Sequence, residues 1–290
     1  MKAIRTLGLI ANLTRPRARE GLAALLQAAE AAGITLLPAP ETAAAMPGGL
    51  ACAPADFAAA GAQGVISLGG DGSLLAAARA VAGSGLPLAG LNVGRLGYLT
   101  AVNEEGFGDF LRRLAAGDYT LEARTTLSAG RVGAQTHFPD ALNDVVIARA
   151  EGGHAFALLL TLDGFPVARY LCDGLILSTP TGSTAYSLSV GGPVVAPTAQ
   201  ALLISVIAPH TLSARPLVVP RESHIEVRVD EAEGAPAKVY ADGIAVAELR
   251  PGDAIQAAAA PQPVQFILPA HHNPYEPLSN KLAWSASFRR

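Results

Sequence analysis

The sequence predicts an α/β N-terminal domain with a parallel, Rossmann-like sheet, followed by a mainly antiparallel, β-sandwich-like C-terminal domain. In the first third of the 290 residues, apolar strand-like runs alternate with helix-like segments, which predicts a parallel sheet with helices on both faces. From about Tyr119 onward, short β-branched or alternating runs separated by turn residues dominate, as in antiparallel domains. We place the domains at residues 1–118 and 119–270, with a tail, 271–290, that returns to the first domain.

The elements of the first domain follow from apolar periodicity and helix-ending glycines. The segment Arg17–Ala32 has Leu22, Leu25, Leu26 and Ala29 on one face, and Gly33 ends it. The residues from Pro38 to Pro54 are rich in Ala, Pro and Gly and indicate a loop. The strands expected here are Ile4–Ile10, Ile34–Leu37, Val65–Leu68 and Leu88–Val93, and the helices are Arg17–Ala32, one after Asp71, and Glu105–Ala116.

The second domain is expected to consist of short strands with one helix between Ser183 and Ser189. Apolar alternation and β-branched residues support each strand, and turn residues separate them. The expected strands are Thr120–Leu127, Val145–Ala148, Phe156–Leu162, Leu175–Ser178, Leu203–Ile207, His224–Val229, Lys238–Ala241 and Val264–Leu268.

Composition and charge exclude several classes of protein. The net charge of −3 offers no basic surface for nucleic acid, so an anionic ligand needs backbone amides, a few basic residues or a divalent ion. The two cysteines, Cys52 and Cys172, lack the spacing of metal ligands. No apolar run approaches the roughly 18 residues of a membrane span. We therefore expect a cytoplasmic protein that has no structural metal site and binds neither nucleic acid nor membrane.

Gly69-Gly70-Asp71-Gly72 is the first candidate site, and we call it the glycine turn. It lies between a predicted buried strand and a predicted helix, so its backbone can approach a ligand and the helix N-terminus can offer N–H groups to an anion. Neither standard phosphate-loop pattern is present. Taken alone, the glycine turn fits ordinary turn chemistry as well as it fits phosphate binding.

The second candidate site is the segment Asp173–Pro193. Seven serine and threonine residues fall within Ser178–Ser189, bracketed by glycine and proline. Such a density of hydroxyl groups can hydrogen-bond a polar ligand without adding charge, although a structural Ser/Thr loop has a similar composition. Asn143-Asp144 precedes another strand, and a polar pair at this place is most often a turn or a cap.

These three segments, in this order and spacing, resemble the NAD kinase family. Gly94-Arg95-Leu96-Gly97-Tyr98-Leu99-Thr100, Pro209-His210-Thr211-Leu212 and Arg215-Pro216-Leu217 support the resemblance, which runs from the first strand to Trp284. It implies transfer of a phosphoryl group from ATP to the 2′-hydroxyl of the adenosine ribose of NAD. The Thr179–Gly192 segment is specific to the family, whereas the glycine turn also occurs in lipid kinases and phosphofructokinases.

The resemblance also implies roles for individual residues. Asp71 would be the catalytic base, and Mg²⁺ or another divalent cation would arrive on ATP. Asn143 would read the adenine edge and Asp144 a ribose hydroxyl, with Tyr186 stacking on the adenosine and Asp173 reaching the other end of NAD. The ATP phosphates would meet Gly69, Gly70, Gly72 and Ser73. The full NAD set would be Asp71, Gly72, Asn143, Asp144, His154, Asp173, Thr184, Ala185, Tyr186, Ser187, Leu188, Ser189 and Ala208.

The chain also departs from the family pattern, and alternatives stay open. Asp144 replaces a usual Glu, and Ile244 follows Asp242-Gly243 where Gln is frequent. By analogy we expect a homodimer or homotetramer. The sequence leaves open ATP or polyphosphate as donor and NAD or NADH as acceptor. The rival functions are a diacylglycerol- or sphingosine-type lipid kinase and a dinucleotide sensor without turnover.

Overall fold

The computed structural model describes residues 1–290 except 15, 47, 95–96, 136, 151–155 and 283–290. The chain forms two compact units. The first unit contains residues 1–123 and the segment that begins at Val264, and the second contains Arg124–Pro263. The second unit is therefore inserted, in sequence, between two segments of the first.

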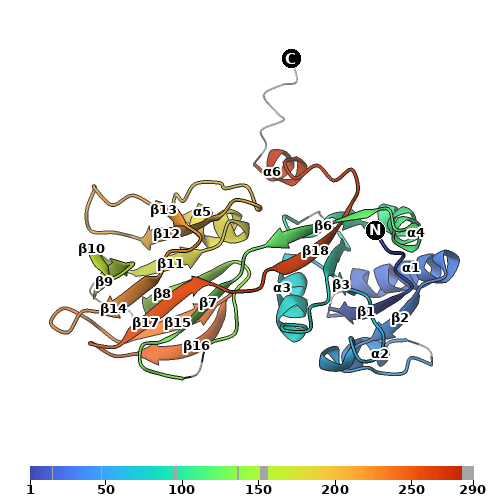
Figure 1. Ribbon diagram of the computed structural model, residues 1–290, viewed down its shortest axis with the longest axis horizontal. Coiled ribbons are helices and arrows are strands. Elements are labelled where there is room, and N and C mark those ends of the chain that lie inside the picture. The colour runs from blue at the N-terminus through green and yellow to red at the C-terminus, as the bar shows by residue number, and fades with distance from the viewer. Residues whose placement is uncertain (15, 47, 95–96, 136, 151–155, 283–290) are drawn as a thin grey trace, which may run out of the picture. The chain divides into compact units, whose positions relative to one another are not determined.

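The first unit is built on a 7-stranded sheet with the order β2-β1-β3-β4-β18-β6, and β5 also pairs with β4. The strand pairs β1–β2, β1–β3, β3–β4, β4–β5 and β4–β18 are all parallel. Figure 1 labels β1, β2, β3, β6 and β18 of this sheet. Their bounds are β1 Thr6–Ala11, β2 Thr35–Pro38, β3 Val65–Leu68, β4 Leu88–Asn92, β5 Val102–Asn103, β6 Tyr119–Arg124 and β18 Val264–Pro269.

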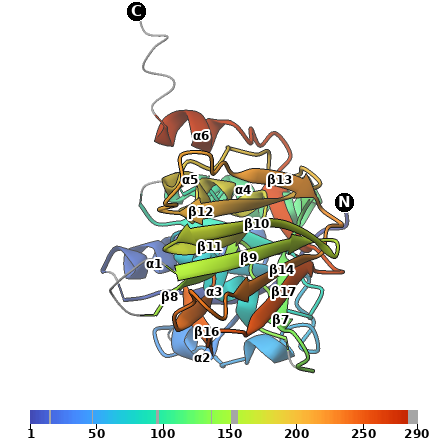
Figure 2. The same cartoon turned by 90° about the vertical axis from the view of Figure 1, so that its left-hand side faces the viewer.

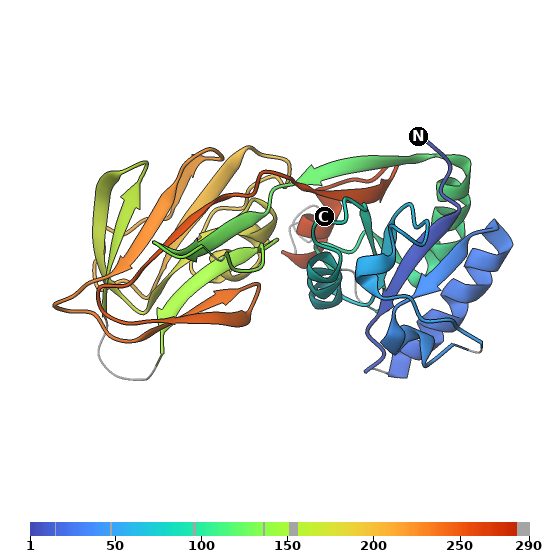
Figure 3. The same ribbon diagram turned by 60° about the horizontal axis from the view of Figure 1, so that its bottom comes forward.

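Helices lie on both faces of this sheet (Figure 3). Alternate residues of the strands face α1 and α4, and these side chains form one buried cluster with Leu25 and Leu111. On the opposite face, Leu74 of α3 lies directly over Gly90, whose missing side chain makes room for it. The helical segments are α1 Pro16–Ala32, α2 Pro40–Ala43, α3 Asp71–Ala80, α4 Phe107–Ala116 and α6 Glu276–Lys281, with short 3₁₀ turns at Pro54–Asp56 and Glu104–Gly106.

The second unit contains two antiparallel sheets, and Figure 2 shows the β10-β9-β14-β17-β7 sheet in front. Its strands are β7 Leu127–Arg131, β9 Phe156–Leu162, β10 Phe165–Cys172, β14 Ile225–Val229 and β17 Ala254–Ala259. The other sheet has the order β13-β12-β11-β8-β15-β16. Its strands are β8 Asp144–Arg149, β11 Gly174–Ser178, β12 Ala201–Ile207, β13 Leu217–Pro220, β15 Ala237–Ala241 and β16 Ile244–Leu249.

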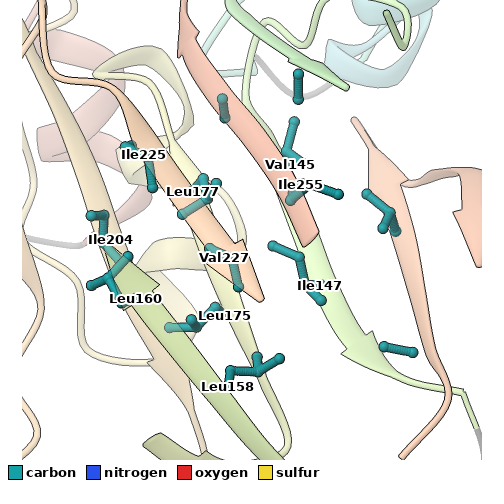
Figure 4. Packing of buried hydrophobic residues seen from close by; sticks show 14 of the residues in the cluster. Val145, Ile147, Leu158, Leu160, Leu175, Leu177, Ile204, Ile225, Val227 and Ile255 are labelled. Atoms are coloured by element: carbon teal, nitrogen blue, oxygen red, sulfur yellow. The ribbon is translucent and has the colours of Figure 1, made fainter. Parts of the chain in front are cut away.

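The core of the second unit lies between its two sheets (Figure 4). Side chains such as Ile147 and Leu175 from one sheet meet Leu158 and Val227 from the other, and all four are fully buried. The strands alternate between core and outer face, as β14 does between buried and half-buried positions. This pattern gives the sandwich that the period-2 alternation predicts.

The predicted fold class is confirmed, but two strands join a different sheet from the expected one. The run Thr120–Leu127 was expected to be one strand, and it divides into β6 and β7 around Thr125. The run Val264–Leu268 was expected in the antiparallel part, yet β18 pairs with β4 in parallel. A strand's own residues report its burial but not its partner, so the sequence could not assign either strand.

No helix among the described residues is long and apolar enough to cross a bilayer.

Candidate active site

The glycine turn follows β3 and opens α3, as the sequence predicts. All four residues of β3 are buried. Gly69 has φ +149°, and a Cβ there would lie 2.4 Å from Ser73 Oγ, so only glycine fits this position. Gly70 precedes the helix in an extended conformation, and Asp71 lies in the first helical turn.

Two backbone amides from the loop after β4 hold the Asp71 carboxylate. Tyr98 N donates to Oδ2 at 2.9 Å, and Leu99 N donates to Oδ1 at 3.0 Å. Burial, with the Asp71 charge as a second cause, raises the pKa of the Tyr98 phenol above its ordinary value. A carboxylate accepts up to about four hydrogen bonds, so the two amides are compatible with a substrate hydroxyl as a further donor.

Gly97 brings this loop close to the carboxylate. A Cβ on Gly97 would lie 1.8 Å from Asp71 Oδ1, so any side chain there displaces one of the two groups. In the sequence, Gly97 belongs to a segment that resembles the family, and the pattern alone indicates no role for it. Arg95 and Leu96, from the same match, lie outside the described residues.

The backbone of the glycine turn is open on its outer side. Gly70 and Gly72 are both exposed, and no atom lies within 4 Å of a Cβ placed on either. Ser73 N and Leu74 N donate to Gly70 O, so an anion would meet the backbone ahead of them, beside Gly70 and Gly72, where a helix start favours negative charge.

In the second unit, the turn Leu142–Asp144, which we call the Asn143 turn, is tied to Asp242. The Asp242 carboxylate accepts the backbone N–H groups of all three residues, with N···O distances of 2.9, 2.8 and 3.2 Å. Asp242 N donates in return to Asp144 O at 3.0 Å. In the sequence, Asp242 is notable only as the residue two positions before Ile244. Its contact with residues about a hundred positions away left no signal in the sequence.

The other side of the Asn143 turn is tied to the residues that follow β11. Thr179 N and Ser178 Oγ donate to Asn143 O at 2.9 and 3.2 Å, and Thr179 Oγ1 donates to Leu142 O at 2.6 Å. The side-chain oxygen Oδ1 of Asn143 is buried and has no hydrogen-bond partner. A buried acceptor without a donor is costly, so this atom suits a ligand that brings a donor.

Asp144 is a buried acid whose carboxyl has a raised pKa. It is 6% exposed, and burial, with the Asp242 charge as a second cause, raises the pKa of its carboxyl to about 7. A hydrogen bond from the Tyr186 backbone N–H acts in the opposite direction. Perturbed carboxyls of this kind are typical of functional sites.

The hydroxyl-rich segment folds into a 3₁₀ turn, Thr181–Thr184, and the short helix α5, Tyr186–Ser189. Tyr186 is 44% exposed and Ser189 is also exposed, so both can meet a ligand. Ser187 is fully buried, and its Oγ lies 2.9 Å from Ser205 Oγ, which ties α5 to β12. Thr184 Oγ1 donates to Thr181 O. Thr184, Ala185 and Leu188 are half-buried.

The structure separates the second unit's candidate residues into two groups, one at each end of β11. The Asn143 turn lies beside Ser178 at one end, since Asp144 pairs with Ser178. Asp173 and Ala208 lie together at the other end, where Asp173 N donates to Ile207 O. A strand advances about 3.3 Å per residue, so the two groups are separated by roughly 16 Å along β11. His154 lies outside the described residues.

Asp173 forms an ion pair with an arginine, and Ala208 has a positive φ angle. Arg149 Nη2 lies 3.4 Å from Asp173 Oδ1. Ala208 has φ +45°, one of the positive values among non-glycine residues, and it is exposed. Among the described residues, no group of three or more His, Cys, Asp or Glu side chains could hold a metal ion.

Comparison with protein families identifies both units. Residues 52–119 match the family model described as "ATP-NAD kinase N-terminal domain", and residues 142–268 match "ATP-NAD kinase C-terminal domain". An NAD kinase of Marinobacter nauticus is 36% identical over 289 residues, which cover 99% of this chain and 98% of that protein. One of Moorella thermoacetica is 39% identical over 265 residues, 90% of this chain and 84% of that protein.

Solved structures share the fold. Yeast NADH kinase complexed with NADH superposes with a TM-score of 0.86 at 24% identity, covering 100% of this chain and 90% of that one. An NAD kinase from Archaeoglobus fulgidus in complex with ATP gives a TM-score of 0.72 at 23% identity, covering 97% of this chain and 99% of that one. At these identities the likeness concerns the fold.

Proposed function

The chain belongs to the NAD kinase family, and from this premise we propose that it transfers the γ-phosphoryl group of ATP to the 2′-hydroxyl of the adenosine ribose of NAD. The oxygen of the 2′-hydroxyl forms the new bond to phosphorus. The bond from the γ-phosphorus to the β,γ-bridging oxygen breaks, which releases ADP and leaves NADP. Asp71 accepts the hydroxyl proton.

The observation that carries the proposal is the Asp71 carboxylate, fixed by two backbone amides beside the exposed glycines of the glycine turn. Phosphoryl transfer needs little covalent help from the protein, and its rate depends mainly on positioning and on charge neutralisation. A fixed carboxylate meets the first need, because it orients the ribose hydroxyl and accepts its proton as the bond to phosphorus forms.

The phosphate side of the reaction requires groups that favour negative charge. We assign this role to the backbone amides around Gly70 and Gly72, since Ser73 N already donates to Gly70 O at 3.0 Å, with Mg²⁺ entering as part of the ATP substrate. The open outer side of the first turn of α3 supports the assignment. An acidic chain thereby binds a polyanion through amide dipoles and a substrate-borne cation.

The NAD side of the proposal rests on the second unit. The unpartnered Oδ1 of Asn143 suits the adenine amino group, because asparagine pairs well with adenine's donor and acceptor edge. Asp144 would bind a ribose hydroxyl, and the exposed Tyr186 ring would stack on the base. Asp173 and Ala208 would serve the nicotinamide end of NAD.

Asp71→Asn tests the proposed base. The substitution keeps the size of the side chain but removes its basic group, so we expect NADP formation to fall at least about 100-fold while NAD affinity stays within a few-fold. Asp109→Asn is the matched control, because Asp109 also lies in the first turn of a helix of the same unit. Near-full turnover by Asp71→Asn, in a coupled NADP assay, would contradict the assignment.

The same purified protein separates the rival functions. Formation of NADP from NAD and ATP supports the kinase. Binding of the dinucleotide without product indicates a sensor. Absence of both binding and product would favour the lipid kinase. Parallel reactions with polyphosphate and with NADH determine the donor and the acceptor.

We further propose a homodimer or homotetramer, which light scattering would detect as a multiple of the 29.5 kDa chain.

A further inference from the structure

Asp242 makes four hydrogen bonds to the Asn143 turn, although it is not part of the proposed NAD contacts. Its two carboxylate oxygens accept three consecutive backbone N–H groups, those of Leu142, Asn143 and Asp144. Hydrogen bonds to an ionised acceptor are stronger than neutral ones. One side chain therefore fixes three successive peptide groups of the segment that carries the proposed adenine contact.

With Asp242 in place, the backbone of Asn143 has its polar groups engaged on both sides. Its N–H meets Asp242 at 2.8 Å, and its carbonyl accepts from Thr179 N and Ser178 Oγ. A Cβ on Gly182 would lie 2.1 Å from Asn143 O, so the following segment is also packed against this peptide. The buried Oδ1 of the Asn143 side chain has no partner. The turn is thus a rigid support for one unused acceptor.

We propose that Asp242 is a positioning residue that holds Asn143 Oδ1 as a fixed hydrogen-bond acceptor. The enzyme thereby selects a purine with an amino group at position 6. This inference rests on the proposed NAD kinase function. Adenine offers an N–H donor at that position. Hypoxanthine offers a carbonyl oxygen there, which would leave the Asn143 acceptor unpaired and opposite another acceptor. A site built around a buried hydrogen bond rejects analogues that lack the matching group.

The chain supplies a matched control for Asp242. Asp242 and Gly243, with φ +46° and +78°, form the turn between β15 and β16. Asp163 and Gly164, with φ +52° and +84°, form the same kind of turn between β9 and β10. The Asp163 carboxylate also accepts a backbone amide, from His224 at 2.8 Å. Asp163 differs in having no contact with the Asn143 turn.

Asp242→Gly and Asp163→Gly are therefore the informative pair, because glycine adopts a positive φ without strain and each hairpin turn is retained. With saturating ATP, kcat and KM are measured for NAD and for nicotinamide hypoxanthine dinucleotide. We expect wild type and Asp163→Gly to prefer NAD in kcat/KM by at least about 10-fold. In Asp242→Gly we expect the KM for NAD to rise by roughly 10-fold and the preference to fall below about threefold, with kcat changed much less.

A loss of stability alone would lower the activity on both dinucleotides equally, so it cannot reproduce this result. The isosteric Asp242→Asn, which keeps one acceptor oxygen, should give an intermediate preference and provides the test if Asp242→Gly does not fold. An unchanged preference in a folded Asp242 variant overturns the inference, as does wild-type enzyme that forms NADP without preferring NAD. Wild-type protein that forms no NADP overturns the proposed function itself.

Discussion

At the scale of single residues, two aspartates hold loops that are distant in sequence by accepting their backbone amides. Asp71 holds the loop at Tyr98 and Leu99, and Asp242 holds the Asn143 turn. Charge-assisted bonds of this kind are strong and directional. Each carboxylate and its loop therefore act as one unit, so changing the loop disturbs the carboxylate as much as changing the aspartate itself.

Gly97→Ala tests this coupling at Asp71. The added methyl group would lie 1.8 Å from Oδ1, so the carboxylate or its loop must move. Misplacing a catalytic group by about 1 Å can cost 10²-fold in rate, and we expect kcat to fall at least about 10-fold. Steady-state kinetics of Gly97→Ala, Asp71→Asn and the double variant measure the coupling. Equal losses from Gly97→Ala with and without Asp71 would show that the two residues act independently.

The raised pKa of the Asp144 carboxyl predicts that the stability of the protein depends on pH. Burial raises the pKa of its carboxyl from 3.8 to about 7, so the unfolded chain loses this proton at lower pH than the folded chain. The contribution to stability is fully present below about pH 4 and is lost as the pH rises through 7. Relative to Asp144→Asn, the free energy of unfolding of wild type should fall by roughly 2 kcal/mol between pH 5 and pH 8. Urea unfolding at both pH values measures it, and a constant difference would contradict the raised pKa.

At the scale of elements, the sequence predicted those features that local patterns determine. The glycine turn was found because glycines flank an aspartate between a buried strand and a helix, and β9 and the start of β18 were found from apolar alternation. Strand partners were not predictable, and neither was the role of Asp242. Asp163-Gly164 and Asp242-Gly243 are the same dipeptide in the same kind of turn, and only tertiary pairing shows which one reaches the Asn143 turn.

The first turn of α3 gives a prediction in which stability and function change in opposite directions. Gly72→Ala adds a methyl group to a helical position with no atom within 4 Å, so the free energy of unfolding should rise by about 0.5–1 kcal/mol. The same methyl group lies where we propose that phosphate approaches, so the KM for ATP should rise by roughly 10-fold.

Gly108→Ala is the control for this prediction. Gly108 lies in α4 and also has no atom within 4 Å of an added Cβ. We expect a similar gain in stability from Gly108→Ala and no change in the KM for ATP. Thermal unfolding and ATP titrations measure both effects. An ATP KM that stays at the wild-type value in Gly72→Ala would contradict the assignment of phosphate to this turn.

At the scale of the whole molecule, each unit has a hydrophobic core of its own. Ile267 of β18 belongs to the first core and Ile255 of β17 to the second, although the two residues are close in sequence. Both are at most 1% exposed. Because the chain crosses from one unit to the other between these strands, sequence distance does not determine which unit a residue stabilises.

Ile267→Ala and Ile255→Ala therefore make a matched pair with the same side-chain chemistry. Each should lower the free energy of unfolding of its own unit by about 2–5 kcal/mol, the usual cost of such a truncation in a core. Amide hydrogen exchange resolves the effect by element. Ile267→Ala should accelerate exchange in β1, β3 and β4 and leave β8, β11 and β12 protected, and Ile255→Ala should do the reverse. Faster exchange in β11 caused by Ile267→Ala would mean that the two cores unfold as one cooperative unit.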